Sequence, residues 1–190
     1  MTKALDIVLL PSKDLWNELL EINSHLEEDW IDFKSGCVPH LTLAMGAVEE
    51  DAIISLWERI SEDFASLTLK PEGVVCFPRI ESTLCHLKFA ASEELRKLHD
   101  RAVSEMHRFQ KTLPERHMFY KGEAGEGTVS YARSFLDDFS GEKFDPHMTL
   151  GYGDSDYEMK KDNYTFSKLA ICQLGDHNTC RDVLFETVGF

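Results

Sequence analysis

Hydrophobic residues along the chain form two patterns, short continuous runs and stripes with helical spacing. Short continuous runs bounded by turn residues are typical of strands. On this basis we predict strands over residues 5–10, 67–77, 84–90, 166–174 and 183–188. Two more strands are predicted where a segment of eight residues occurs twice, reading PHLTLAMG at residues 39–46 and PHMTLGYG at residues 146–153.

Three stripes have the spacing that places apolar side chains along one face of a helix. The first stripe follows a candidate N-cap at Ser12, and the third follows a candidate N-cap at Ser92 and stops before Pro114. Residues 121–127 are rich in Gly and Glu and predict a flexible loop, without the ending of a phosphate-binding P-loop. The stripes comprise Leu15, Leu19, Ile22, Leu26 and Trp30; Ile53, Trp57, Ile60 and Phe64; and Leu95, Leu98, Ala102, Met106, Phe109 and Leu113.

The order of these elements predicts the fold class. Several strands adjoin with only short connections, which favours antiparallel pairing in an α+β protein with helices on the outer faces. One copy of the repeated segment falls in each half of the chain. We therefore predict that residues 1–190 form a single bilobal domain, with two pseudo-symmetric, mostly antiparallel sheets and a central cleft.

Side chains of a strand alternate between its two faces, so each repeat has a polar face and an apolar face. In the first copy His40, Thr42 and Ala44 share one face, and the leucines between them belong to a core. The small third residue is expected to let a ligand approach the backbone. The second copy predicts a matching face formed by His147, Thr149 and Gly151.

Two histidines and two hydroxyls are sufficient for acid–base chemistry on a phosphodiester. An unperturbed histidine has a pKa of about 6.5, so near neutrality one imidazole can be neutral while the other is protonated. The neutral ring removes a proton from the nucleophile and the protonated ring gives one to the leaving alkoxide, which predicts a bell-shaped pH–rate profile. Thr42 and Thr149 can donate hydrogen bonds to the phosphate oxygens. This chemistry requires no metal and no cofactor, and we expect neither.

A single His-x-Thr pair would indicate little, because a histidine in an apolar strand is usually structural. The repetition with matching flanks favours a functional role, although a duplicated fold could keep the pattern without activity. A non-catalytic nucleotide-binding or RNA-end-binding module therefore remains an alternative. A metal-dependent hydrolase is a weaker one, because the sequence lacks a recognisable spacing of metal ligands.

Composition limits the ligand and the setting. Twenty basic and thirty-four acidic residues give a net charge of −14, which disfavours long nucleic acids and favours a small phosphate ester. The chain contains no apolar run long enough for a membrane helix, and Asp6 interrupts the apolar stretch that a signal peptide would need. We expect a cytoplasmic monomer. Five cysteines without a C-x-x-C pair predict reduced, partly buried thiols rather than disulfides.

These features resemble the 2H phosphoesterase superfamily, which includes the 2′-5′ RNA ligases and cyclic phosphodiesterases. The resemblance rests on His40-Leu41-Thr42 and His147-Met148-Thr149, on their separation by about one lobe, and on the order of elements. It implies a bilobal α+β fold in which the two motifs face each other across a cleft. It also implies metal-independent action on 2′,3′-cyclic phosphates, 2′-5′ linkages or related nucleotide phosphodiesters. By this resemblance, His40 and His147 would be the acid–base pair, and Thr42 and Thr149 phosphate ligands.

The leading hypothesis is therefore a metal-independent phosphodiesterase for a small nucleotide or an RNA end, with a 2′,3′-cyclic phosphate as its substrate. The alternatives are the binding module and a 2′-5′ RNA ligase or 2′-5′ phosphodiesterase. Other side chains could border the cleft, but we favour plainer roles for them. These are a solvated sheet face for His86 and Lys88, no assigned role for Arg79 and Arg133, structural packing rather than base stacking for Phe119 and Tyr120, and surface positions for His99, His107 and His117.

Overall fold

The computed structural model describes residues 1–26, 31–79 and 82–188. Its largest element is a seven-stranded sheet with the strand order β4-β5-β6-β2-β1-β8-β9, accompanied by a two-stranded sheet formed by β3 and β7. The strands are β1 (Thr2–Leu10), β2 (Leu41–Glu49), β3 (Leu67–Leu69), β4 (Pro71–Pro78), β5 (Thr83–Phe89), β6 (His147–Tyr152), β7 (Tyr164–Phe166), β8 (Lys168–Leu174) and β9 (Cys180–Glu186). The helices are α1 (Lys13–Asn23), α2 (Ile53–Ser61), α3 (Glu93–Phe109) and α4 (Glu126–Asp138).

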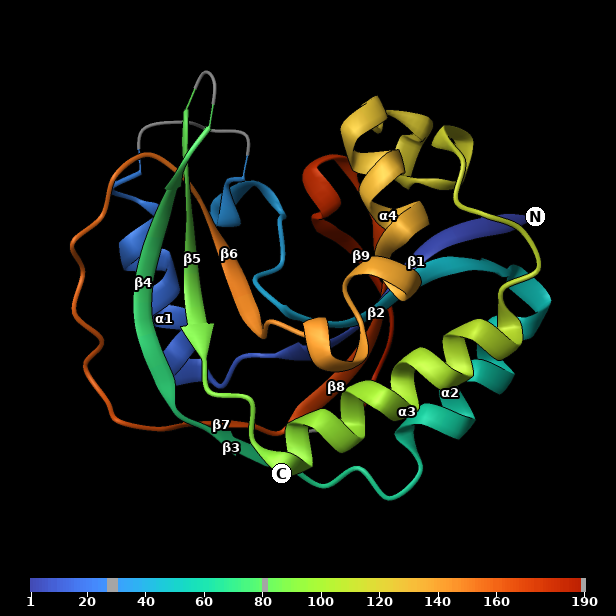
Figure 1. Ribbon diagram of the computed structural model, residues 1–190, viewed down its shortest axis with the longest axis horizontal. Helices are drawn as coiled ribbons and strands as arrows, with labels where there is room; N and C mark the ends of the chain where they lie inside the picture. The colour runs from blue at the N-terminus through green and yellow to red at the C-terminus, as the bar shows by residue number, and fades with distance from the viewer. Residues whose placement is uncertain (27–30, 80–81, 189–190) are drawn as a thin grey trace.

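The large sheet is divided into two lobes (Figure 1). Strands β4, β5 and β6 form one lobe with α1, and strands β2, β1, β8 and β9 form the other with α2, α3 and α4. A single register pair, Leu41 with Met148, joins β2 to β6 between the lobes. Every pairing between the described strands is antiparallel, which confirms the predicted α+β class. The two predicted sheets are thus joined edge to edge into one.

The predicted helices are present, but each ends earlier than its apolar stripe. Ser12 and Ser92 cap α1 and α3 by accepting hydrogen bonds from the backbone N–H of the third residue of each helix. The end of α1 follows from Asn23, whose side-chain amide donates to the carbonyls of Ile31 and Leu150 and turns the chain away. Leu26 therefore lies beyond the helix, and Trp30 lies outside the described residues. None of the described helices is long and apolar enough to cross a membrane.

The other two helices also stop early. Helix α2 ends at Ser61, before Phe64, and α3 ends at Phe109, four residues before the exposed Leu113. The backbone of Gln110 is extended, and its side-chain carbonyl accepts a hydrogen bond from Ala47 N–H at 3.0 Å. This contact with β2 ends α3 earlier than the apolar spacing indicates.

Helix α4 is absent from the sequence prediction, and it lies on the cleft side of the sheet rather than on an outer face. The predicted loop over residues 121–127 instead contains a 3-10 turn and the first residues of α4. Gly125 is the N-cap of α4 and Gly127 lies in the first turn of this helix, so the local composition resembles that of a loop. Its buried positions nevertheless follow helical spacing, so a signal was present in Thr128, Val129, Ala132, Phe135 and Leu136.

The prediction of reduced thiols is wrong for one pair. Cys76 of β4 and Cys85 of β5 are direct partners in the strand register and form a disulfide, with Cα atoms 4.1 Å apart. Their sequence separation carries no sign of this pairing, because only the hairpin register brings them together. Cys37, Cys172 and Cys180 are free and buried.

Candidate active site

The first His-x-Thr segment contains a β-bulge immediately after its threonine. Val8 of β1 pairs with Thr42, whereas the preceding Ile7 pairs with Ala44, so that Leu43 has no partner in the register. The extra residue shifts the alternation of side chains along β2 by one position. Thr42 and Met45 therefore face the cleft, and Ala44 faces α3 and the core.

The second segment repeats this device. His86 of β5 pairs with Thr149, whereas Cys85 pairs with Gly151, so that Leu150 is the bulged residue. The two motifs are thus equivalent in backbone geometry as well as in sequence, and Tyr152 takes the position that Met45 occupies in the first copy.

The two bulges overturn one prediction, because neither small residue adjoins the cavity. A Cβ added to Gly151 would lie 3.0 Å from Leu26 Cδ1 and 3.2 Å from Asn23 Nδ2, both on the α1 side. Gly151 also has a φ of +138°, a backbone angle that residues other than glycine rarely adopt. The glycine is therefore required by the packing of α1, and ligand approach does not explain it.

Each bulged carbonyl is held by a side chain from an outer helix. His99 of α3 donates from Nδ1 to the Leu43 carbonyl at 2.7 Å, and Asn23 of α1 donates to the Leu150 carbonyl at 2.7 Å. His99 also accepts from Gly141 N–H, and it is only 1% exposed. Its predicted surface position is wrong, whereas His107 and His117 are exposed as predicted.

His40 and His147 are oriented in the same way. The Nδ1 atom of each ring hydrogen-bonds at 2.7 Å to the carbonyl two residues before it, Val38 and Asp145 respectively. A carbonyl accepts only, so in the neutral rings the proton is on Nδ1 and the lone pair is on Nε2. In both histidines the nitrogen left for proton transfer is therefore Nε2.

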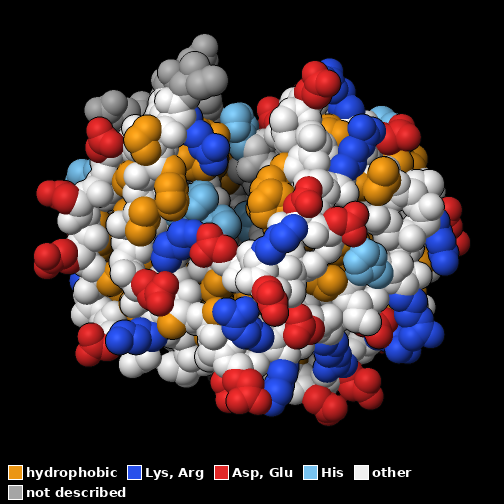
Figure 2. All heavy atoms as spheres, viewed as in Figure 1, with side chains coloured by type: hydrophobic (Ala, Val, Ile, Leu, Met, Phe, Trp, Pro, Cys, Tyr) orange, Lys and Arg blue, Asp and Glu red, His pale blue; other side chains and the backbone are white. Residues whose placement is uncertain are grey.

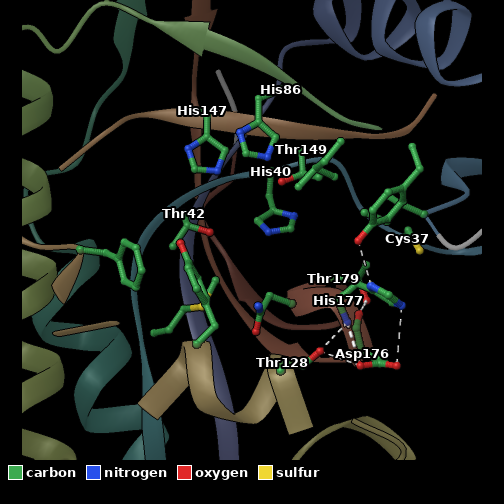
Figure 3. Close-up of a pocket in the computed structure, with 18 of the residues that line it drawn as sticks. Cys37, His40, Thr42, His86, Thr128, His147, Thr149, Asp176, His177 and Thr179 are labelled. Carbon is green, nitrogen blue, oxygen red and sulfur yellow. Dashed lines mark hydrogen bonds and ion pairs between the residues drawn. The ribbon is translucent and has the colours of Figure 1, made fainter. Parts of the chain in front are cut away.

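These side chains line a cavity of about 1230 Å³ between the lobes. Figure 2 shows this face of the molecule hollowed between the lobes, with histidine side chains in the hollow. In Figure 3 the rings of His40 and His147 point toward the same space, with Thr42 and Thr149 beside them. The structure thus brings together all four residues that the sequence singles out.

A third histidine lies beside His147. The ring of His86 stacks on that of His147 with centroids 4.1 Å apart and planes inclined by 12°. Its Nδ1 is buried and has no hydrogen-bond partner among the described residues. The predicted solvated sheet face is therefore wrong for His86. The period-two pattern of β5 already placed His86 on the polar face, so the sequence contained the signal without showing what covered it.

A buried carboxyl group, Asp6, lies beside His40, although Asp6 was not among the predicted site residues. Thr42 Oγ1 donates to Asp6 Oδ2 at 2.7 Å, and His40 Nε2 lies 3.5 Å from the same oxygen. Asp6 is fully buried, and an acid inside the apolar run of β1 was a visible anomaly. The equivalent position in the other lobe is Leu84, because Asp6 pairs with Met45 as Leu84 pairs with Tyr152. The two halves of the site therefore differ in charge.

Burial sets the protonation of these groups. It lowers the pKa of His40 to about 4, with a smaller contribution from nearby His147, and it also lowers the pKa of His147. Burial together with His147 and Lys88 lowers the pKa of His86 to about 3. In the opposite sense, burial raises the pKa of Asp6 well above its usual range. In the absence of a ligand, the three imidazoles are therefore neutral near pH 7.

Of the other residues that could border the cleft, some lie at the cavity and the rest lie away from it. Arg79 lines the cavity, and Lys88 forms an ion pair with Asp145, which also lines it. Arg133 donates to the Pro114 carbonyl, away from the cavity. Phe119 is buried in the core and Tyr120 also lies outside the cavity, in accord with a structural role. The Phe and Tyr side chains that line the cavity are instead Phe33, Tyr131, Phe135, Phe139, Phe144 and Tyr152.

One group of metal-ligating side chains is present among the described residues. Asp6, His40 and Cys180 each offer one ligand atom, and these three atoms lie within 4.8 Å of one another. His147 and Thr149 belong to the opposite lobe and are not part of this group.

The fold and the site together define a bilobal α+β protein in which two equivalent His-x-Thr strands direct their imidazoles into one cavity. The model of the 2′-5′ RNA ligase superfamily matches residues 11–170. The chain belongs to this superfamily of 2H phosphoesterases, whose members are phosphoesterases and RNA ligases.

Solved structures share the fold at low sequence identity. Escherichia coli LigT in its apo form is 14% identical with a TM-score of 0.57, covering 98% of this chain and 97% of that one. TT0787 of Thermus thermophilus is 15% identical with a TM-score of 0.58, covering 96% of each chain. A protein described as a phosphoesterase is 13% identical with a TM-score of 0.57, covering 98% of each chain. No curated protein matches the chain.

Proposed function

We propose that this protein is a metal-independent phosphodiesterase that acts on a small nucleotide or an RNA end, with a nucleoside 2′,3′-cyclic phosphate as its substrate. One observation carries the proposal: His40 and His147 present equivalent Nε2 atoms to one cavity, each fixed by a backbone carbonyl at Nδ1. Membership of a superfamily of phosphoesterases and RNA ligases supports it.

The two imidazoles perform complementary proton transfers. In attack on a cyclic phosphate, one Nε2 accepts a proton from water while the other donates a proton to the departing ribose oxygen. Burial keeps both rings neutral in the free protein, so the second ring must gain its proton with the substrate. A phosphodiester anion bound between the rings favours this, because a nearby negative charge stabilises the imidazolium.

The threonines have unequal roles in this mechanism. The Thr42 hydroxyl donates to Asp6, so it is engaged before a ligand binds. Thr149 lines the cavity beside His86, its partner in the strand register. In this lobe no carboxyl group occupies the position equivalent to Asp6, which is Leu84. We infer that Thr149 is the first hydrogen-bond donor to a non-bridging phosphate oxygen, where charge collects during the reaction.

The experiment compares the wild type with His40→Ala and His147→Ala on nucleoside 2′,3′-cyclic phosphates in excess EDTA. We expect each substitution to lower kcat/KM by about 10²–10⁴-fold, because each removes one proton-transfer step. The exposed His107→Ala and His117→Ala variants are matched controls and should retain activity. Activity that survives either cleft substitution, or that is lost in EDTA, would overturn the mechanism.

A second candidate activity is formation or cleavage of 2′-5′ linkages, which the name of the matched superfamily favours. The same variants are therefore assayed with a 2′-5′-linked dinucleotide and with RNA ends. Turnover of 2′-5′ linkages alone would assign this second activity. Ligand binding without turnover of any substrate would assign a binding module.

A further inference from the structure

Three side chains, from two strands and one connecting segment, converge at Nε2 of the His40 ring. Asp6 lies on β1, His40 precedes β2, and Cys180 is the first residue of β9. Their ligand atoms lie within 4.8 Å of one another, and His40 Nε2 is 3.5 Å from Asp6 Oδ2. We propose that these residues bind a zinc ion, and that the bound ion inhibits the enzyme by occupying His40 Nε2.

The ligand types and their spacing suit zinc. A thiolate, an imidazole and a carboxylate are its usual protein ligands, with bonds of about 2.0–2.3 Å in a tetrahedral arrangement. Such bonds place neighbouring ligand atoms roughly 3.3–3.8 Å apart, a range that includes the Asp6–His40 separation. The Cys180 thiol completes three positions with a small side-chain movement, and His40 is the ligand that also lines the cavity.

Asp6 supplies an independent indication that a cation belongs here. Its side chain is fully buried, and Oδ1 has no hydrogen-bond partner within the described part of the chain. A buried carboxyl oxygen without a partner is costly, and a bound cation would remove that cost. Its other oxygen, Oδ2, accepts a hydrogen bond from Thr42 and lies 3.5 Å from the neutral His40 ring, so no charged group among the described residues balances this side chain.

The surroundings hold the ligands in place. His40 Nδ1 donates to the Val38 carbonyl, the arrangement that commonly orients a metal-binding histidine through its second nitrogen. Val38 N–H in turn donates to the Cys180 carbonyl at 3.0 Å, in an isolated bridge that ties the His40 segment to β9. The backbone thus fixes two of the three ligands relative to each other.

The charges also balance. Zinc binding releases the Cys180 proton, and any proton on Asp6, to solvent. One carboxylate and one thiolate then neutralise the divalent ion within a buried site. His40 Nε2 donates its lone pair to the metal, so it cannot accept or deliver a proton. Inhibition follows because the proposed function requires this atom.

The test uses EDTA-treated protein from which the chelator has been removed. Titration with Co²⁺ should produce the near-ultraviolet charge-transfer absorption of a cobalt–thiolate bond, and calorimetry should measure zinc binding directly. We expect Cys180→Ala to abolish the absorption and to weaken zinc binding by at least about tenfold, since even supporting residues of metal sites contribute this much. Asp6→Asn should weaken zinc binding and keep the absorption. Cys37→Ala, at another free buried cysteine, is the matched control and should behave as the wild type.

The inhibition is measured on the same proteins with a nucleoside 2′,3′-cyclic phosphate. Zinc should inhibit the wild type and Cys37→Ala, whereas Cys180→Ala should keep its zinc-free activity and resist inhibition. No cobalt–thiolate band, or a band lost in Cys37→Ala and kept in Cys180→Ala, would overturn the site. The inhibition rests on the proposed function, but the binding does not. A Cys180-dependent band in a protein without turnover would leave the site standing and reject the function.

Discussion

His86 shows how one buried side chain couples the site to the stability of the molecule. Its ring is enclosed between His147 and Phe77, with centroids 4.1 and 5.4 Å away, and its pKa is lowered to about 3. In the unfolded chain the pKa returns to about 6.5. As the pH falls below 6.5, the unfolded state therefore binds a proton that the folded state does not. The stability contributed by neutral His86 is complete above this value and is lost progressively toward the folded pKa.

The corresponding prediction concerns His86→Phe, which keeps an aromatic ring but removes the titration. Between pH 7 and pH 5 the wild type should lose up to about 2 kcal/mol more free energy of unfolding than this variant. Urea unfolding at the two pH values measures the difference. The exposed His107→Phe variant should follow the wild type. Equal losses in wild type and His86→Phe would mean that His86 is not held neutral by the fold.

At the scale of elements, the paired bulges determine which residues reach the cavity. Gly151 lies against α1 with a positive φ, so Gly151→Ala should destabilise the protein by about 1–3 kcal/mol through backbone strain and contact with Leu26. Thermal or urea unfolding checks this, and the folded protein should keep its KM. Gly127→Ala in α4 is the control, because nothing lies within 4 Å of its added Cβ. An unchanged stability with a raised KM would restore the idea that Gly151 makes room for a ligand.

These elements also show how far the sequence could be interpreted. The repeat was sufficient to predict its own two strands, the two lobes and the four residues His40, Thr42, His147 and Thr149. It was sufficient because matching sequence patterns favour matching local geometry. It could not reveal the bulges, since strict alternation assumes an unbroken ladder. The disulfide, the early helix ends and the burial of His99 depend on contacts between distant segments. Asp6 was visible as an acid inside an apolar run and His86 as a residue on the polar face of its strand, but only the fold shows that both adjoin the histidine pair.

At the scale of the whole molecule, the net charge of −14 and the cavity between the lobes limit the substrate. A protein that binds RNA through many phosphates loses affinity steeply as the salt concentration rises, because the gain from releasing counterions becomes smaller. Here few cations adjoin the cavity, with Arg79 and Lys143 in its lining and Lys88 paired to Asp145. A long RNA therefore gains little binding energy beyond that of its terminal nucleotide, and the acidic protein surface repels the remaining nucleotides.

The prediction is that kcat/KM for an RNA of about 20 nucleotides with a 2′,3′-cyclic end does not exceed that for the cyclic mononucleotide by more than about tenfold, because extra phosphates find few partners. Raising the salt from about 50 to 200 mM should leave both values unchanged or increase them, since it screens repulsion between the acidic protein and an anionic substrate. Parallel steady-state assays of the two substrates measure this, with the mononucleotide as the internal reference. A steep fall for the RNA alone would reveal a phosphate-binding surface outside the cavity and would reject the small-substrate proposal.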